Sequence, residues 1–78
     1  MKQLKEFRDK KNLTQQQIAI KLNVSPSYYI KVEQGNAKAG KGLIDKFIKA
    51  FPDDRFEILS LFYPEESTAG SIGGETNG

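Results

Sequence analysis

Apolar residues recur at helical spacing along most of the chain and stop near Pro64. Residues three or four positions apart lie on one face of a helix, so each such stretch predicts an amphipathic helix. The first is expected over residues 2–11, the fourth from residue 41 or 42 to 51, and the fifth from about residue 54 to Pro64. The residues expected to face inward from the first and fourth are Leu4, Phe7, Leu43, Ile44, Phe47, Ile48 and Phe51.

Polar residues mark the starts of two shorter helices between these. Thr14 can cap the second helix, and Gln17, three residues later, can complete a capping box. Ser25 can cap the third helix, with Pro26 at its first position, where a missing N–H costs nothing. Between the two helices stands Asn23, a residue type that tolerates a left-handed backbone. This stretch therefore predicts two short helices joined by a tight turn.

Two helices joined in this way have the layout of a helix-turn-helix, whose second helix enters the major groove of DNA. The chain resembles the Xre-type helix-turn-helix family, to which the lambdoid phage repressors and Cro belong, over about residues 3–62. The resemblance implies an all-α, compact five-helix bundle and an ion pair between Arg8 of the first helix and Glu33 of the third. The segments that carry it are LKEFRDKKNLTQ, IAIKL and VSPSYYIKVEQG.

The chain departs from the family pattern at two places. Asn23 stands at the turn, where the family usually has glycine. Residues 37–42 replace the usual Asn-Pro-Ser before the fourth helix, and Lys41 occupies a position that is usually apolar. The sequence therefore leaves the start of the fourth helix open between residues 41 and 42.

The resemblance implies that the exposed side of the third helix reads base edges. Lys31 is the best candidate for O6 and N7 of guanine. Ser27 discriminates poorly between bases, and Pro26 offers only an apolar contact, for example to a thymine methyl group. Tyr28 has two equal interpretations: it binds a phosphate or sugar, or it is a half-buried aromatic that covers the helix. The full predicted set is Ser25, Pro26, Ser27, Tyr28 and Lys31.

Two other places are expected to hold phosphates, which position the protein without reading sequence. The resemblance implies one clamp at Thr14 and Gln15, where backbone N–H groups of the second helix add their attraction. Lys38, Gly40 and Lys41 form the second candidate, because glycine permits close approach of the backbone and lysine brings positive charge. The alternative for this second segment is an ordinary flexible loop, and its spacing is wrong for a nucleotide-binding P-loop.

Charge is divided unevenly along the chain. Residues 1–51 carry 11 Lys or Arg against 4 acids, whereas residues 52–78 carry 1 Arg against 6 acids. A basic domain ahead of an acidic end is typical of a protein that attracts phosphate on one side. The alternative is that the lysines only make the surface soluble.

The composition also argues against several functions. The chain has no cysteine and no histidine, so it lacks the side chains most used for metal binding and general base catalysis. We therefore expect no enzymatic activity, no cofactor and no metal. No apolar run approaches the length of a membrane span, and the N-terminus lacks the apolar stretch of a signal peptide. Both features favour a cytoplasmic protein without membrane contact.

The C-terminal region yields further expectations. Asp54 and Glu57 can form a capping box for the fifth helix, whose buried face is expected to comprise Phe56, Leu59 and Phe62. Residues 64–78 are rich in Gly, Ser, Thr and acids, and are expected to form a disordered, flexible tail or linker after a domain of residues 1–63. Elsewhere, the helix phase places Ile20 and Ile30 on exposed faces.

One domain of this size reads few base pairs, so two copies are expected on half-sites about 34 Å apart. We expect a homodimer on double-stranded DNA, with Leu61 and Tyr63 at the contact. The sequence as a whole predicts a sequence-specific transcriptional regulator, most simply a repressor, in a bacterial or phage setting. The alternative is a protein-interaction module that keeps the fold without binding DNA.

Overall fold

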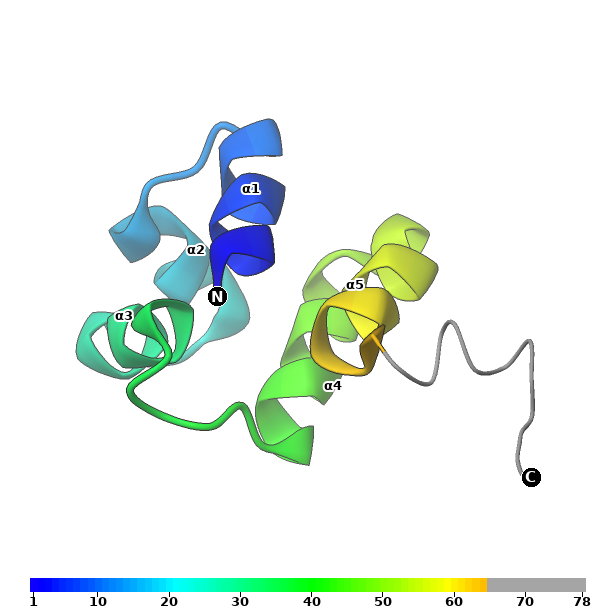
Figure 1. Ribbon diagram of the computed structural model, residues 1–78. Coiled ribbons are helices and arrows are strands. Elements are labelled where there is room, and N and C mark those ends of the chain that lie inside the picture. The colour runs from blue at the N-terminus through cyan, green and yellow to red at the C-terminus, as the bar shows by residue number, and fades with distance from the viewer. Residues whose placement is uncertain (65–78) are drawn as a thin grey trace, which may run out of the picture.

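The computed structural model describes residues 1–64, which are helical without any strand. The expected all-α, five-helix fold is confirmed (Figure 1). The predicted flexible tail lies outside the described residues from 65 onward. The elements are α1 (Lys2–Lys10), α2 (Gln15–Leu22), α3 (Pro26–Gln34), α4 (Lys41–Ala50), the 3₁₀ turn η1 (Pro52–Asp54) and α5 (Arg55–Phe62).

All five helices contribute to one hydrophobic core. In Figure 1, α1, α2 and α3 form one group and α4 and α5 a second, joined by the loop between α3 and α4. Phe47 of α4 connects the groups, because its ring lies 6.1 Å from Phe7, 6.5 Å from Tyr29 and 5.4 Å from Phe62, measured between centroids. The core cluster comprises Leu4, Phe7, Ile18, Ala19, Leu22, Tyr29, Val32, Leu43, Phe47, Phe51 and Ile58.

The starts of α2 and α3 match the sequence prediction. The backbone N–H of Gln17 donates to Thr14 Oγ1 at 3.0 Å, and the backbone N–H of Thr14 donates to Gln17 Oε1 at 2.9 Å. Ser25 Oγ accepts from the backbone N–H of Tyr28 at 3.2 Å, with proline at the first helical position. These bonds satisfy N–H groups that have no acceptor within the helix.

The turn between α2 and α3 depends on Asn23, which has φ 59° and ψ 47°. This left-handed conformation reverses the chain after α2, and asparagine adopts it more readily than most residues. The departure from glycine is therefore compatible with the tight turn. Ala19 of α2 is fully buried and belongs to the core cluster.

The predicted capping box at α5 is wrong. Asp54 ends the 3₁₀ turn η1 and makes no side-chain hydrogen bond to the first turn of α5. Its carboxylate instead pairs with Lys11, and Glu57 pairs with Lys10. Lysines at the end of α1 attract both carboxylates away from the helix start, which local sequence could not reveal.

The predicted buried face of α5 is wrong for Phe56, whereas Phe62 does pack against the core. Ile58 is the fully buried residue, whereas Phe56 is 85% exposed. Leu61 and Phe62 are half-buried and pack against the core. Because α5 carries apolar residues on two opposite sides, periodicity alone could not decide which side faces inward. Of the two isoleucines expected outside, Ile20 is 74% exposed and Ile30 is half-buried.

Candidate nucleic-acid interface

A buried ion pair attaches α1 to α3. Arg8 Nε donates to Glu33 Oε1 at 2.8 Å, and Arg8 Nη2 donates to Glu33 Oε2 at 3.1 Å. The third guanidinium nitrogen, Nη1, donates to the backbone carbonyl of Leu13 at 2.9 Å. Such a two-point pair fixes direction as well as distance. It therefore sets the position of α3 relative to α1 and to the loop that leads into α2.

Glu33 also binds a residue of α2 and a second residue of α3. Tyr29 donates its hydroxyl to Oε1 at 2.7 Å, and Gln15 Nε2 donates to Oε2 at 2.9 Å. The carboxylate thus joins residues from the first three helices. Sequence reasoning found only the bond to Arg8. The spacing of four residues between Tyr29 and Glu33 was a usable signal, because such residues adjoin on a helix.

The environment keeps this cluster in one charge state. Burial opposes ionisation of Glu33, but hydrogen bonds from Arg8, Tyr29 and Gln15 outweigh it and hold the pKa of Glu33 below its ordinary value. The hydrogen bond to Glu33 raises the pKa of Arg8 in turn. Burial, followed by the bond to Glu33, raises the pKa of Tyr29. At neutral pH the cluster is a carboxylate held by a cation and two neutral donors.

The residues expected to read bases lie on this fixed helix. Ser25, Pro26, Ser27 and Lys31 are exposed. Ser27 and Lys31 are four positions apart and share one face of α3. Within the described chain, Lys31 makes no side-chain hydrogen bond or ion pair. The ammonium group is therefore available to an external acceptor.

Tyr28 differs from the other members of this set. It is half-buried, packs against the core, and donates its hydroxyl to the backbone carbonyl of Lys38 at 3.3 Å. This bond connects the start of α3 with the loop before α4. Tyr28 is therefore a half-buried aromatic that covers the helix, which was one of the two interpretations of the sequence. A contact between Tyr28 and DNA stays a prediction.

The first candidate phosphate clamp lies at the start of α2. The Thr14 hydroxyl already accepts the capping hydrogen bond, and one Gln15 amide N–H is used by Glu33. A side-chain amide has two N–H donors, so Gln15 keeps one for another acceptor. The backbone N–H groups of the first helical turn that the cap does not use add to this donor set.

The second candidate clamp is the loop from Lys38 to the start of α4. Lys38, Gly40 and Lys41 are exposed, and Gly40 is the N-cap of α4 without a side-chain cap. At Gly40, φ is −76°, which any residue adopts. A Cβ placed on Gly40 or Gly42 meets no atom within 4 Å. The fold therefore has no steric need for glycine at these two positions.

In the described chain, exposed lysines without a carboxylate partner lie on α3 and on the loop that leads into α4. Within residues 1–64, no carboxylate pairs with Lys31, Lys38 or Lys41. A surface of unpaired cations attracts polyanions at long range. Three lysines of α1 and its C-terminal cap are paired: Lys5 with Asp9, Lys10 with Glu57, and Lys11 with Asp54.

Comparison with known families agrees with this geometry. The model of a helix-turn-helix family, the one typified by Xre, lambda repressor and Cro, matches residues 4–52. The chain belongs to this family. The match spans α1 to α4 together with the first residue of η1, and so includes both candidate clamps and α3. No curated protein and no solved structure gave a significant match. Members of this helix-turn-helix family are DNA-binding regulators and are generally not enzymes.

Within residues 1–64, no helix has the length and apolar character that a membrane span requires. No group of three or more His, Cys, Asp or Glu side chains within residues 1–64 is placed to hold a metal ion.

Proposed function

We propose that this helix-turn-helix protein binds specific sequences in double-stranded DNA and represses transcription by occupying them. The observation that carries the proposal is the exposed polar side of α3, where Ser27 and Lys31 share a face and Lys31 has no partner among residues 1–64. Lysine donating to guanine and serine to several bases are contacts used in the major groove. We expect the protein to be of bacterial or phage origin and to act in the bacterial cytoplasm.

The Glu33 cluster supports this function because base reading needs a fixed helix. A side chain that must reach one base edge depends on the position of its backbone. Arg8 of α1 and Gln15 of α2 donate hydrogen bonds to Glu33 of α3, and these bonds hold α3 in place. Gln15 is also expected to reach a phosphate with its remaining N–H. Phosphate contact at α2 would then be mechanically linked to the orientation of α3.

The loop before α4 is expected to hold a second stretch of backbone. Lys38 and Lys41 supply charge, and Gly40 and Gly42 allow the chain to approach phosphates closely. Two copies on adjacent half-sites would then cover enough base pairs to mark a site, with centres about one helical turn apart.

The decisive experiment is selection of bound duplexes from a random DNA pool, followed by titration of the enriched and a scrambled duplex at two salt concentrations. We expect an enriched motif and a specificity ratio of about a thousandfold or more. We also expect affinity for both duplexes to fall steeply as salt rises. Salt-dependent binding without an enriched motif would contradict sequence specificity. Absence of binding at low salt would contradict DNA binding altogether and favour a protein-interaction module.

A further inference from the structure

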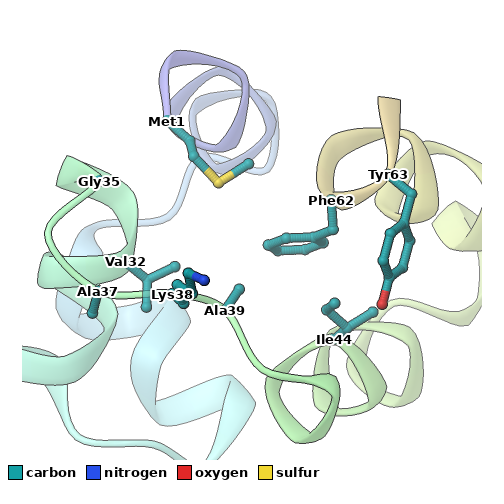
Figure 2. A pocket seen from close by; sticks show the side chains of 9 residues that line it. All are labelled: Met1, Val32, Gly35, Ala37, Lys38, Ala39, Ile44, Phe62 and Tyr63. Carbon is teal, nitrogen blue, oxygen red and sulfur yellow. The ribbon is translucent and has the colours of Figure 1, made fainter. Parts of the chain in front are cut away.

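An apolar cavity lies where the loop between α3 and α4 meets the end of α5 (Figure 2). Its volume is about 250 Å³. Figure 2 shows Met1 and Phe62 reaching into it, and Tyr63 at its edge above Ile44 of α4. Val32 of α3 forms a further part of the wall. Side chains from four separate parts of the fold therefore surround the cavity.

Lys38 gives this apolar cavity a positive charge. Within residues 1–64 it is the one charged side chain that lines the cavity, and its ammonium group has no carboxylate partner there. Its two neighbours in the loop, Ala37 and Ala39, line the cavity with methyl groups. Apolar walls with one unpaired cation complement a ligand that has an apolar body and one negative charge.

The size of the cavity limits the ligand to a small molecule. The volume of about 250 Å³ is below the roughly 300–1,000 Å³ of sites for drug-sized ligands. An apolar cavity of about 150 Å³ can hold one benzene ring. The cavity therefore has room for one ring or branched alkyl group that carries a short acidic side chain.

We propose that this cavity binds a small apolar carboxylic acid, with its hydrocarbon part against Val32, Ile44 and Phe62 and its carboxylate paired with the ammonium group of Lys38. Burial of the hydrocarbon surface supplies most of the affinity. The ion pair fixes the orientation of the ligand. The proposal deepens the DNA-binding function, and it rests on that function only for the effect of the acid on DNA.

The cavity is connected to the surface that is proposed to bind DNA. The backbone N–H of Ala37 donates to the carbonyl of Lys31 at 3.2 Å, and the Tyr28 hydroxyl donates to the carbonyl of Lys38 at 3.3 Å. The loop that lines the cavity is thus bonded to two residues of α3. A carboxylate beside Lys38 neutralises the charge proposed to attract a DNA phosphate. The acid therefore acts as an inducer that weakens DNA binding.

Nuclear magnetic resonance titration of the full chain tests the site without DNA. The probe is phenylacetate, and its controls are the neutral isostere phenylacetamide and acetate, which lacks the ring. A ligand of about ten non-hydrogen atoms is expected to bind with a dissociation constant of about 1 mM. Backbone amide resonances of Ala37, Lys38, Ala39 and Ile44 should shift and saturate together. Absence of saturation at about ten times that concentration, or saturating shifts confined to other residues, would overturn the proposal.

Three variants distinguish the ion pair from the apolar contact. Lys38→Ala should weaken phenylacetate about fivefold, the value of one exposed ion pair, and leave phenylacetamide unchanged. Ala39→Leu should weaken both compounds, because it fills the cavity, and its thermal melting checks the fold. The matched control is Lys49→Ala, which removes an exposed lysine of α4 that does not line the cavity. Equal effects of Lys38→Ala and Lys49→Ala on phenylacetate would overturn the assignment of the carboxylate to Lys38. Phenylacetate affinity that falls as protein concentration rises would show that a second copy of the chain fills the cavity, and would also overturn the proposal.

The DNA arm separates this proposal from the proposed function. One phosphate contact contributes about eightfold to affinity between 1 M and 0.1 M salt. Saturating phenylacetate at about 0.1 M salt should therefore weaken the parent on the selected duplex by up to about eightfold, and acetate at equal ionic strength should not. Lys38→Ala already lacks the contact, so its DNA affinity should not respond to phenylacetate. Unchanged affinity of the parent would overturn the competition at Lys38, whereas acid binding without any DNA binding would contradict only the proposed function.

Discussion

Tyr29 and Glu33, one turn apart on α3, share a hydrogen bond of 2.7 Å in which the tyrosine hydroxyl donates to Oε1. The same oxygen accepts from Arg8 Nε at 2.8 Å. Two donors from different helices therefore converge on one buried carboxylate oxygen. This arrangement explains how a charged group is tolerated at the centre of a small domain, because each charge and lone pair facing the interior has a partner.

Removing the Glu33 charge should destabilise the fold strongly. Glu33→Gln leaves the buried Arg8 guanidinium only the half-exposed Asp9 carboxylate, 3.5 Å from Nη1. Loss of one partner of a buried pair costs about 3–5 kcal/mol. That cost is comparable with the whole stability of a domain of this size. Urea unfolding followed by circular dichroism measures it.

Two further variants control this experiment. Lys5→Gln breaks only the exposed pair with Asp9 and should cost at most about 1 kcal/mol. The double variant Arg8→Met, Glu33→Met should recover part of the lost stability, because it removes the unpaired charge but leaves the buried Tyr29 hydroxyl without its acceptor. A Glu33→Gln protein with the parental urea midpoint would contradict the contribution assigned to the pair.

Acid should weaken the fold through the same carboxylate. The folded pKa of Glu33 lies below its ordinary value of 4.5, so between the two values the unfolded chain binds a proton that the folded chain does not. The stabilising contribution is therefore present above pH 4.5 and is lost as pH falls through the folded pKa. Urea midpoints between pH 6 and pH 3 should show this decline. The Arg8→Met, Glu33→Met double variant should show a shallower decline, and equal slopes would contradict the assignment to Glu33.

Lys31 and Lys38 should respond differently when shortened to alanine. Lys31→Ala is expected to lose about 1–3 kcal/mol on the selected duplex and to relax one base position. Lys38→Ala should weaken all duplexes alike and reduce the salt dependence by about one unit of slope. Repeating the random-pool selection with each variant distinguishes the two roles. An unchanged motif and affinity for Lys31→Ala would show that another face reads the DNA.

Gly42, the second residue of α4, should matter for DNA binding and not for folding. A Cβ on Gly42 meets no protein atom within 4 Å, and alanine favours a helix by roughly 0.5–1 kcal/mol over glycine. Gly42→Ala should therefore be as stable as the parent or slightly more stable, while its DNA affinity falls. Thermal melting and titration of the selected duplex measure the two effects. Unchanged affinity would show that phosphates do not approach the backbone at this point.

Local sequence was sufficient to predict the start of each helix in the helix-turn-helix. Thr14, Gln17 and Ser25 form the expected caps, and Asn23 has the left-handed conformation expected of the turn. These features involve residues at most three positions apart, so the interactions are set by short-range stereochemistry. The Arg8–Glu33 pair was predicted from the family pattern, since residues 25 positions apart have no local signal.

The failures at α5 have the opposite cause. Asp54 and Glu57 satisfy the spacing of a capping box, but lysines of α1 bind both carboxylates in the folded chain. The apolar residues of α5 occupy two sides, and the direction in which η1 delivers the helix decides that Ile58 is buried and Phe56 exposed.

The sequence by itself determined the helices, the tight turn and the polar composition of α3, because caps, periodicity and backbone preferences act over a few residues. Only the tertiary structure decided that Gln15 and Tyr29 join Glu33 and that Phe56 faces outward. Such outcomes depend on how helices distant in sequence pack against one another. Their packing is a compromise over the whole core, and no single segment encodes it.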